Sequence, residues 1–561
     1  MRQALSALFL LSLFAVATSA TAYEGPENRG SGSVEIEDAS SELQPRASDR
    51  GRKDRRDGVD YRMNTIRTGI LILGFAVYLW GFWLPRSGSE KLARLRLAAL
   101  LVLAAAAYAS YYQFFQYSHV RGFATTDNFH YYVGSKYFDE LGYFGLYECS
   151  LVALAERGLQ PSRAAEDQAR DLRSMALGPY DAIKESGSDC PQRFGRERWA
   201  AFADDVAFFA ENWPDHLRRA TWRDHGFHPS PSWILAGSGF ANLAPLDEAP
   251  VLFGLSRLDR ILIALAFALV AWGFGIQTAC LLMLIWGTGC LWRYTWVGDA
   301  FLRHLWWITA IAGVVALRRS YPLLGGVALA ASGMVRLFPA ALGLGYALRA
   351  LQQFRNTGGV EARYRRFAWG AALTLGALGL AGWVALTPSV YSDFVLKITR
   401  FNEMAVTNQI GLEVVLQPLA GKASWAAASL RILAIGLFLG LFWRALRYTR
   451  DWEAAALGAS MIPIILAPTN YYYSFFLVVA LLALERPRVG CILLAAATAW
   501  NINGLILYRE YEEFFWASII AVAASFLVVL EVITSKGTPG RDQENPEASS
   551  TALRSQAPIS G

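Results

Sequence analysis

The chain has 561 residues, of which 54% are hydrophobic and 17% are charged. Soluble proteins typically contain about 45–50% apolar and about 25% charged residues. This balance excludes collagen, coiled coils, disulfide-rich miniproteins and wholly disordered chains, and it indicates a polytopic membrane protein. The net charge of +6 is spread over loops instead of forming one basic patch, which argues against nucleic acid as a partner.

The two ends of the chain differ from the apolar middle. Residues 1–22 have the charged, apolar and small-residue order of a secretory signal. We expect cleavage after Ala20 or Ala22, and an uncleaved anchor is the alternative. Residues 23–64 lack apolar periodicity and predict a disordered outer arm, and residues 535–561 predict a disordered cytoplasmic tail.

Apolar runs long enough to cross a hydrocarbon core of about 30 Å recur along the chain. Residues 65–112 are expected to form the first two transmembrane helices, and residues 258–534 a transmembrane core with an outer loop at 388–424. The expected spans are 66–84, 95–112, 259–273, 275–291, 301–317, 321–350, 367–387, 425–443, 453–468, 471–485, 489–508 and 514–534.

Basic residues set the expected topology, because Lys and Arg concentrate in short cytoplasmic loops. The basic loops can share one side only if residues 321–350 cross twice, with a break between Arg336 and Pro339, since proline removes a backbone donor. One long kinked helix is the alternative. The sequence therefore predicts an all-α polytopic protein of the inner (plasma) membrane, with about 13 transmembrane helices after the signal.

This topology places residues 113–257 outside as one large extracytoplasmic loop. Cys149 and Cys190 both lie in this loop and are candidates for a disulfide in an oxidising compartment. Four apolar residues at helical spacing predict a small helical cap within the loop: Trp199, Phe202, Val206 and Phe209.

The loop begins with a polar and aromatic run at residues 125–138. Asp127 is the candidate catalytic carboxylate, because it lies at the membrane–water boundary ahead of aromatic side chains that can stack on a sugar. A helix N-cap, or an interfacial aspartate that binds backbone amides, is the alternative for Asp127. An aromatic belt at headgroup level is the alternative for the tyrosines of the run.

A proline-rich turn at residues 224–233 lies near the end of the loop. We expect it to close over the cavity and offer Trp233 to a substrate, with His225 and His228 as further candidates for substrate contact. Two histidines three residues apart without a clear third ligand are a weak metal signal, so we expect no metal site here. No cofactor is firmly implied, and dependence on Mg²⁺ or Mn²⁺ stays open.

One set of residues carries a family resemblance: Asp127, Phe129, Tyr131, Tyr132, Gly134, Lys136, Gly142 and Tyr147. The set is similar to the first outer loop of the C-type (GT-C) glycosyltransferases, most closely the polyprenyl-phosphate-mannose-dependent glycosyltransferase family 87. Two shorter matches are Thr407-Asn408-Gln409 and the segment Ala467 to Tyr471. The chain departs from the family in its extra amino-terminal span and in the insertion at residues 150–257.

The resemblance implies an inverting transfer of a mannose-like hexose, or another sugar, from a polyprenyl phosphate. The acceptor would be an extracytoplasmic lipid, glycan or protein, and Asp127 would be the general base. The matching segments supply these substrate-binding candidates: His130, Tyr131, Tyr132, Lys136, Asn408, Asn470 and Tyr471.

The leaving phosphate needs cationic stabilisation. The candidates are Arg303, His304, Arg336, Lys397 and Arg400. Arg336 is the best of these, because an arginine inside an apolar stretch is costly unless it is paired or solvated in a cavity. Any one of them alone is more often an interfacial cation.

Two other functions stay open. The first is a transporter or flippase of a lipid-linked or anionic solute, and the second is a surface polysaccharide polymerase or ligase with a lipid-diphosphate donor. The absence of a convincing internal repeat, and the gathering of polar candidates at one interface, favour the transferase over the transporter. The sequence contains no nucleotide-binding motif, which disfavours nucleotide-sugar chemistry.

Overall fold

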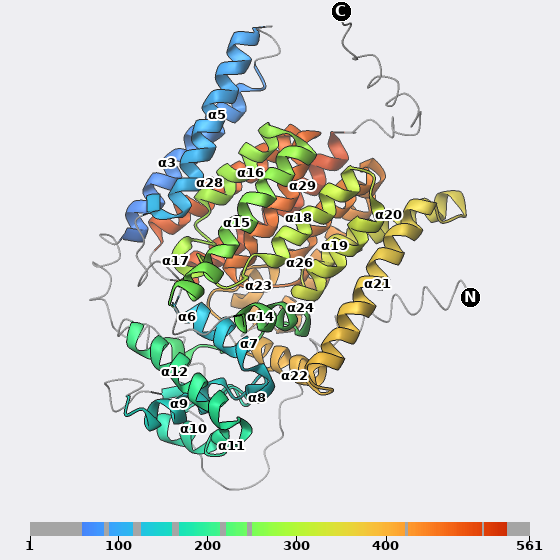
Figure 1. The fold of residues 1–561 in the computed structure, drawn as a ribbon. Coiled ribbons are helices and arrows are strands. Elements are labelled where there is room, and N and C mark those ends of the chain that lie inside the picture. The colour runs from blue at the N-terminus through green and yellow to red at the C-terminus, as the bar shows by residue number, and fades with distance from the viewer. Residues whose placement is uncertain are drawn as a thin grey trace, which may run out of the picture. The chain divides into compact units, whose positions relative to one another are not determined.

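A computed structural model of the chain describes residues 59–83, 89–115, 125–159, 168–213, 220–243, 249–404, 406–420, 424–507 and 510–535 (Figure 1). The chain divides into two units, Met1–Lys53 and Asp54–Gly561, and every described residue belongs to the second. The expected signal, most of the expected outer arm and nearly all of the expected tail lie outside the described residues.

The described residues form a predominantly helical membrane protein. Six helices are long and apolar enough to cross a membrane: Tyr61–Trp80, Glu90–Tyr111, Ala362–Ala385, Trp425–Tyr448, Pro487–Ile506 and Tyr511–Thr534. Shorter apolar helices lie between them. The all-α prediction omitted one small antiparallel hairpin, in which β1 (Gln168–Arg170) pairs with β2 (Leu177–Pro179).

Helices occur at every expected span. They are α3 (Val59–Trp80), α5 (Glu90–Tyr111), α15 (Ala249–Phe274), α16 (Ile276–Thr288), α18 (Leu305–Arg318), α19 (Pro322–Val335), α20 (Ala340–Thr357), α21 (Ala362–Ala385), α24 (Ser424–Ala445), α25 (Asp451–Gly458), α26 (Ile462–Ile465), α27 (Phe476–Ala480), α28 (Pro487–Ile506) and α29 (Glu510–Thr534). Short 3₁₀ segments extend this set: η6 (Leu446–Tyr448), η7 (Ala459–Met461), η8 (Asn470–Phe475) and η9 (Leu481–Leu484).

Helix α3 begins at Val59, so the last residues of the expected disordered arm are helical instead. Met63 and Asn64, which belong to the expected arm, are buried, and the Nδ2 of Asn64 donates to the carbonyl of Asn501 in α28 at 3.3 Å. Packing against α28 therefore continues the helix where composition alone predicts an arm.

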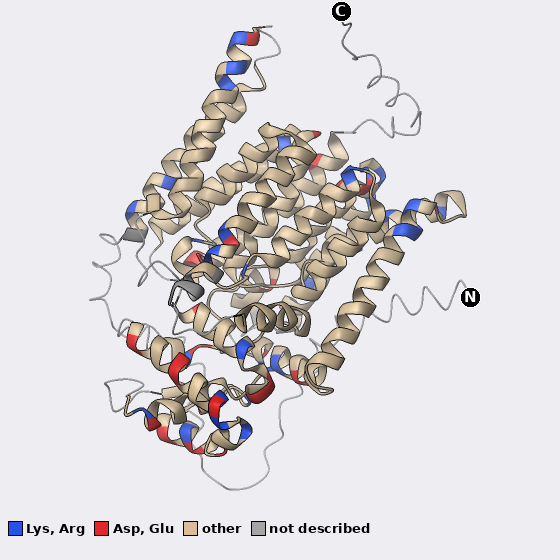
Figure 2. Ribbon diagram, in the orientation of Figure 1, with Lys and Arg blue, Asp and Glu red and all other residues tan. Residues whose placement is uncertain are grey.

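Helices α19 and α20 are separated at Arg336, which has an extended backbone. Arg318, at the end of α18, lies 3.6 Å from Glu485, and Arg450 lies 3.1 Å from the same carboxylate. Arg349, in the second half of α20, donates to the carbonyl of Leu446 at 3.1 Å. The start of α19 and the end of α20 therefore lie at one arginine-rich end, and the two helices run in opposite directions (Figure 2).

A cluster of shorter elements lies at the end where α19 meets α20. Helix α14 (Pro231–Ala241) packs against α7 (Gly134–Lys136), α19 and α21, as Figure 1 shows. The other elements are η3 (Gln113–Phe115), α6 (Thr125–Asn128), η5 (Phe129–Val133), α8 (Phe138–Leu141), α9 (Leu146–Glu156), α10 (Tyr180–Ser186), α11 (Cys190–Arg193), α12 (Arg196–Asn212), α17 (Tyr294–Val297), α22 (Val390–Asn402) and α23 (Leu412–Ala420).

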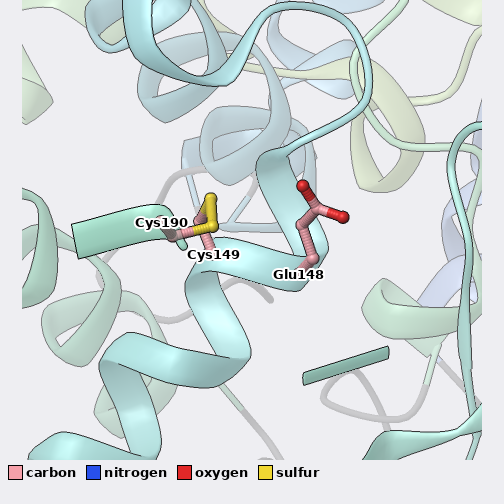
Figure 3. Close-up of side chains that lie close together, drawn as sticks. All are labelled: Glu148, Cys149 and Cys190. Atoms are coloured by element: carbon pink, nitrogen blue, oxygen red, sulfur yellow. A yellow bond between two sulfur atoms is a disulfide. The ribbon is translucent and has the colours of Figure 1, made fainter. Parts of the chain in front are cut away.

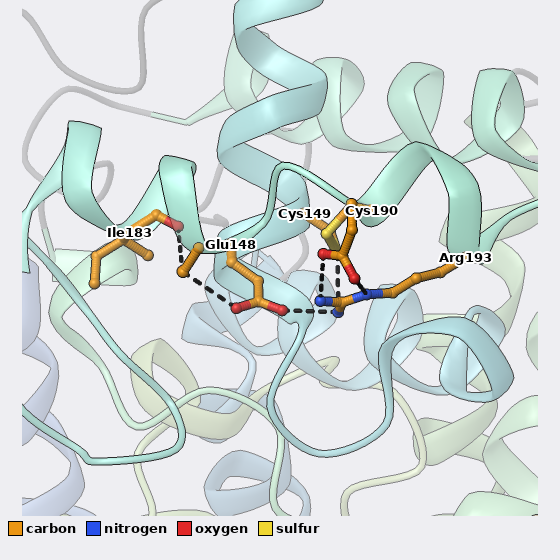
Figure 4. Close-up of a disulfide and its surroundings, with 7 residues drawn as sticks. Glu148, Cys149, Ile183, Cys190 and Arg193 are labelled. Carbon is orange, nitrogen blue, oxygen red and sulfur yellow. Dashed lines mark hydrogen bonds and ion pairs between the residues drawn. A yellow bond between two sulfur atoms is a disulfide. The ribbon is translucent and has the colours of Figure 1, made fainter.

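The expected helical cap is present as α9–α12. Phe202, Val206 and Phe209 of α12 are buried, as their spacing predicts. A disulfide joins Cys149 of α9 to Cys190 of α11, the two cysteines expected to pair, with 5.4 Å between their Cα atoms (Figure 4). The cap is therefore covalently closed, and its buried side chains continue the hydrophobic core of the membrane helices.

Candidate functional site

Asp127 lies on a continuous helical run formed by α6, η5 and α7. Its middle is a wide π-helical turn, a feature that is frequent at functional sites. Asp127 and Tyr131 are four residues apart and project toward the same side of this run. His130 instead contacts the cap, where its Nε2 lies 2.8 Å from the hydroxyl of Tyr147. The side of the run that carries Asp127 and Tyr131 is thus the candidate catalytic side. The side that carries His130 attaches the run to α9.

Arg303 reaches Asp127 from the irregular loop that joins α16 to α18. The loop is tightly turned, and Asp299 and Leu302 have φ angles of 53° and 50°, which non-glycine residues rarely adopt. The carboxylate of Asp259 in α15 secures the end of the loop: its Oδ2 accepts the backbone N–H of Arg303 at 2.9 Å, that of His304 at 3.2 Å, and lies 3.0 Å from Nδ1 of His304.

Asp127 and Arg303 form an ion pair, with 3.6 Å between Oδ2 and Nη1. The side chains are 20% and 5% exposed, respectively. At this separation the two charges attract each other without a hydrogen bond. Among the described residues, neither Asp127 Oδ2 nor Arg303 Nε has a hydrogen-bond partner. Both atoms therefore retain hydrogen-bonding capacity that a bound polar group can use.

Arg336 lies next to this pair, at the break between α19 and α20. Its Nη2 donates to the Tyr131 hydroxyl at 3.0 Å, and its guanidinium lies over the rings of Tyr131 and Tyr472 at 5.4 and 5.5 Å. Arg303 lies over Tyr131, Tyr471 and Tyr472 at 5.0, 4.4 and 5.5 Å. The two guanidiniums thus share the rings of Tyr131 and Tyr472, and Arg303 also faces Tyr471, an arrangement that stabilises cations through the negative ring faces.

We call Asp127, Arg303, Arg336 and the three tyrosines the arginine–tyrosine cluster. Arg336 forms no ion pair with the described residues, so the cluster holds two guanidiniums and one carboxylate. Arg336 is 8% exposed, and a buried cation without a counter-ion is costly. An anion that enters the cluster would remove this cost, and the Asp127 carboxylate beside it can accept a proton.

Two further segments meet beside the cluster. The backbone N–H of Asn470 donates to the carbonyl of Asn408 at 2.9 Å, and the Asn408 Nδ2 donates to the Asn470 Oδ1 at 3.2 Å. Asn470 also donates from Nδ2 to the Leu291 carbonyl at 2.6 Å. This pairing fixes Tyr471, the next residue, against Arg303. The hydrogen-bonded pair of asparagines therefore positions Tyr471 within the cluster.

Trp233, which the proline-rich turn was expected to offer to a substrate, is packed in the core. The side chain is 1% exposed, and its Nε1 donates to the carbonyl of Leu302 at 3.1 Å. Its ring centroid lies 5.2 Å from that of Tyr131. The proline at the start of α14 and the adjacent serine cap draw this tryptophan into the core, so it supports Tyr131 from behind.

The two histidines of the proline-rich turn flank one side chain of α22. His228 stacks on Phe401 with 5.3 Å between centroids, and His225 lies 5.1 Å from the same ring. His228 is also 6.1 Å from Tyr131. Burial, reinforced by the charge of Arg336, lowers the pKa of His228 well below its usual value. His228 is therefore neutral at physiological pH and leaves the charge of the cluster to the arginines.

Four candidates lie apart from the cluster or contact it only through others. Lys136 pairs with Asp205 of α12 at 2.7 Å, and so fixes the cap to the helical run. Tyr132 faces Phe301 at 5.7 Å. Arg400 is half-exposed and pairs with Glu403 at 3.2 Å. His304 is held by Asp259, as described above.

Lys397 of α22 is also directed elsewhere. It is fully buried, and its Nζ donates to the carbonyl of Leu172 in the cap at 3.2 Å. Burial, together with the charge of Arg170, lowers the pKa of Lys397 from 10.5 to about 7. This amine therefore joins α22 to the cap instead of adding a permanent charge to the cluster.

The described residues contain one group with the spacing of a metal site, formed by Glu148, Cys149 and Cys190 (Figure 3). Both sulfurs belong to the disulfide, which removes the thiolates that a metal would bind. The Glu148 carboxylate is instead occupied by Arg193 at 2.7 Å, as Figure 4 shows. The geometry supports a structural role for this group.

Two contributing residues were not among the sequence candidates. Tyr472 adjoins Tyr471 and lies under both guanidiniums. It belongs to the run of three tyrosines at 471–473, in which the sequence alone does not distinguish Tyr472 from Tyr471. Asp259 was missed because it lies at the edge of an expected span, although a carboxylate in that position is uncommon and marks a specific partner.

Comparison with protein-family models, with curated proteins and with solved structures found no match to this chain.

Proposed function

We propose that this chain is a membrane glycosyltransferase. It would move a sugar, a mannose-like hexose or another, from a polyprenyl phosphate to a hydroxyl of an extracytoplasmic lipid, glycan or protein. The observation that carries the proposal is the composition of the arginine–tyrosine cluster, in which one carboxylate lies beside an excess of buried positive charge. Such a cluster combines a proton acceptor with a phosphate-binding group.

In this reaction Asp127 accepts the proton of the acceptor hydroxyl. The acceptor oxygen forms a bond to the anomeric carbon from one face, while the bond from that carbon to the phosphate oxygen breaks on the other, which inverts the configuration. The electron pair of the broken bond leaves with the polyprenyl phosphate. Arg303 and Arg336 stabilise the negative charge that develops there, and a single preorganised donor of this kind contributes about 3 kcal/mol.

The three tyrosines of the cluster position the two guanidiniums. Their rings hold the two guanidiniums in place without neutralising them, since a ring face attracts a cation but carries no net charge. A carboxylate in the same position would cancel the charge that the phosphate needs. The tyrosines thus favour phosphate binding over a purely structural ion pair.

We further propose a topology of about 13 spans with the cluster on the extracytoplasmic face of the inner membrane. The support is the arrangement of charge, because Arg318, Arg349 and Arg450 lie at the end opposite the cluster. Positive residues favour the cytoplasmic side. The cap and its disulfide would then lie in an oxidising compartment, where disulfides persist.

Labelling tests this topology. Single cysteines at Ser188 in the cap and at Val360, which is 48% exposed between α20 and α21, would be placed in a chain without Cys280, Cys290 and Cys491. We expect an impermeant maleimide to label the first position in spheroplasts and the second only after lysis. Labelling of Val360→Cys in intact spheroplasts would reject the topology.

The activity itself is tested with the purified full chain in sealed proteoliposomes. A polyprenyl phosphate with a radiolabelled hexose is supplied together with an extract of envelope lipids and glycans as acceptor, and a nucleotide sugar serves as the control donor. We expect a new labelled glycoside from the lipid phosphate only. Movement of intact donor across the bilayer without a new glycosidic bond would replace the transferase with a transporter.

A further inference from the structure

A cavity of about 650 Å³ lies at the arginine-rich end of the molecule, opposite the arginine–tyrosine cluster. It is bounded by α3, α5, the junction of α15 and α16, and the residues before α28. Tyr78 of α3 fixes its position, since its hydroxyl donates to the carbonyl of Pro487, directly after Arg486. The volume is in the range of about 300–1,000 Å³ that small-molecule pockets occupy.

Arg96 of α5 is the charged residue that lines this cavity. Its Nε donates to the carbonyl of Val77 at 3.2 Å, and its guanidinium lies against Gly81, where a Cβ atom would overlap it. The two Nη groups form no hydrogen bond or ion pair with the described residues. A guanidinium in an apolar crevice is costly unless it is solvated or meets an anion, so the cavity favours a negatively charged occupant.

Two apolar residues of the lining, Phe82 and Ile276, are 41% and 46% exposed, and we call this exposed part of the lining its mouth. The adjacent Trp83 is 63% exposed. Exposed aromatic side chains at the end of a membrane-spanning helix lie at headgroup level. An occupant must therefore combine a negative group near Arg96 with an apolar part that extends past this mouth.

Phe274, which also lines the cavity, contacts a second guanidinium, that of Arg318. Arg318 lies 4.9 Å from this ring and donates to the carbonyl of Gly273 at 2.8 Å. Arg318 is compensated by Glu485 at 3.6 Å, so Arg96 is the cation of the described lining that is left for a ligand. Basic pockets between membrane helices on the cytoplasmic side bind anionic lipid headgroups.

We infer that this cavity binds the phosphate headgroup of an anionic phospholipid from the leaflet at the arginine-rich end. The phosphate would meet the two Nη groups of Arg96, and the acyl chains would pass between Phe82 and Ile276 into the bilayer. The inference requires a membrane protein but is independent of the proposed sugar transfer. A structural lipid here would brace α3 and α5 against α16.

The test measures which lipids stay bound to the purified full chain. The protein is reconstituted in nanodiscs with equal amounts of phosphatidylglycerol and phosphatidylcholine, released in mild detergent, and its retained lipids are counted by native mass spectrometry. Arg96→Gln is compared with the wild type. Arg94→Gln is the matched control, because Arg94 lies on the same helix, is 82% exposed in its side chain and pairs with Glu90.

We expect the wild type and Arg94→Gln to retain phosphatidylglycerol preferentially, and Arg96→Gln to lose about fivefold of that preference. Equal retention of both lipids by the wild type, or an unchanged preference in Arg96→Gln, would overturn the inference. Displacement of the lipid by millimolar inorganic phosphate would assign the cavity to free phosphate and also overturn it. If Arg96→Gln does not fold, the lipid preference of the wild type and its competition with inorganic phosphate still test the inference.

Discussion

Asp127 and Arg303 form an ion pair, 3.6 Å from Oδ2 to Nη1, at the meeting point of a helix after α5 and the loop before α18. Each charge compensates the other in a largely buried environment. Arg336, within 5.4 Å of the ring that Arg303 also faces, has no such compensation from the described residues. Because Arg303 has a counter-ion and Arg336 has none among the described residues, substitution of the two arginines should have different effects on stability.

Arg336→Gln should lower the rate of sugar transfer by about 10²–10³-fold, because it removes a preorganised donor to the developing phosphate charge. Its effect on stability should be small, since an uncompensated buried charge disappears with it. Initial rates with a polyprenyl phosphate sugar would measure this. Arg400→Gln is the control, as Arg400 is half-exposed and pairs with Glu403. Equal rates for the two variants would exclude Arg336 from the reaction.

Asp259→Asn should destabilise the loop that carries Arg303. The carboxylate accepts two backbone N–H groups and lies against His304, all through Oδ2, and a neutral amide oxygen in that position would accept the same bonds without the charge that strengthens them. We expect a cost of about 1–3 kcal/mol, visible as a lower Tm in detergent. Asp204→Asn, on the exposed side of α12, should leave the Tm unchanged. A Tm for Asp259→Asn equal to that of the control would contradict the role of Asp259.

Removal of the disulfide should weaken the cap more than the rest of the chain. The bond closes a loop of 41 residues, for which the chain-entropy relation gives about 4 kcal/mol. In the Cys149→Ser, Cys190→Ser double variant, limited proteolysis should cleave α9–α12 before the membrane helices. The Cys280→Ser variant, which has no disulfide to lose, is the control. The same cleavage order and rate in both proteins would show that the bond does not hold the cap.

Lys397 should make stability depend on pH. Its pKa is about 7 in the folded chain, below the ordinary 10.5, because burial opposes the charge. Between these values the unfolded chain binds a proton that the folded chain has released, so stability rises with pH across the window. Thermal unfolding from pH 6 to pH 10 would measure the slope. Lys397→Met should flatten it, whereas Lys184→Met, at an exposed position, should not. A slope that survives in Lys397→Met would show that other groups cause it.

The sequence was informative where a local pattern decides the structure. Apolar runs located the helices, because length and hydropathy govern membrane insertion. Pro339 marked the break after Arg336, since proline cannot continue the hydrogen-bond ladder of a helix. The spacing of Phe202, Val206 and Phe209 identified α12, because buried residues recur at the helical period.

The sequence was less informative where distant residues choose their partners. Lys136, Arg303 and Arg400 resemble one another as isolated cations, yet one pairs with Asp205 in the cap, one enters the cluster and one remains at the surface. The position of Asp259 at the edge of a span signals a partner but does not identify the Arg303–His304 turn as that partner. These differences arise from tertiary packing, and the spacing of residues in the sequence does not predict them. The contacts of Trp233 with Leu302 and Tyr131 likewise follow from the way α14 packs, although its neighbours Ser230 and Pro231 start the helix.

The most direct measurement is the transfer rate of Asp127→Asn, which preserves shape while it removes the proton acceptor. We expect a loss of about 10²–10⁴-fold, with an unchanged elution profile and circular dichroism spectrum. Asp139→Asn is the matched control, because Asp139 is an exposed aspartate of α8, in the same segment between α5 and α15. Transfer by Asp127→Asn at the rate of Asp139→Asn would show that Asp127 serves only as the counter-ion of Arg303.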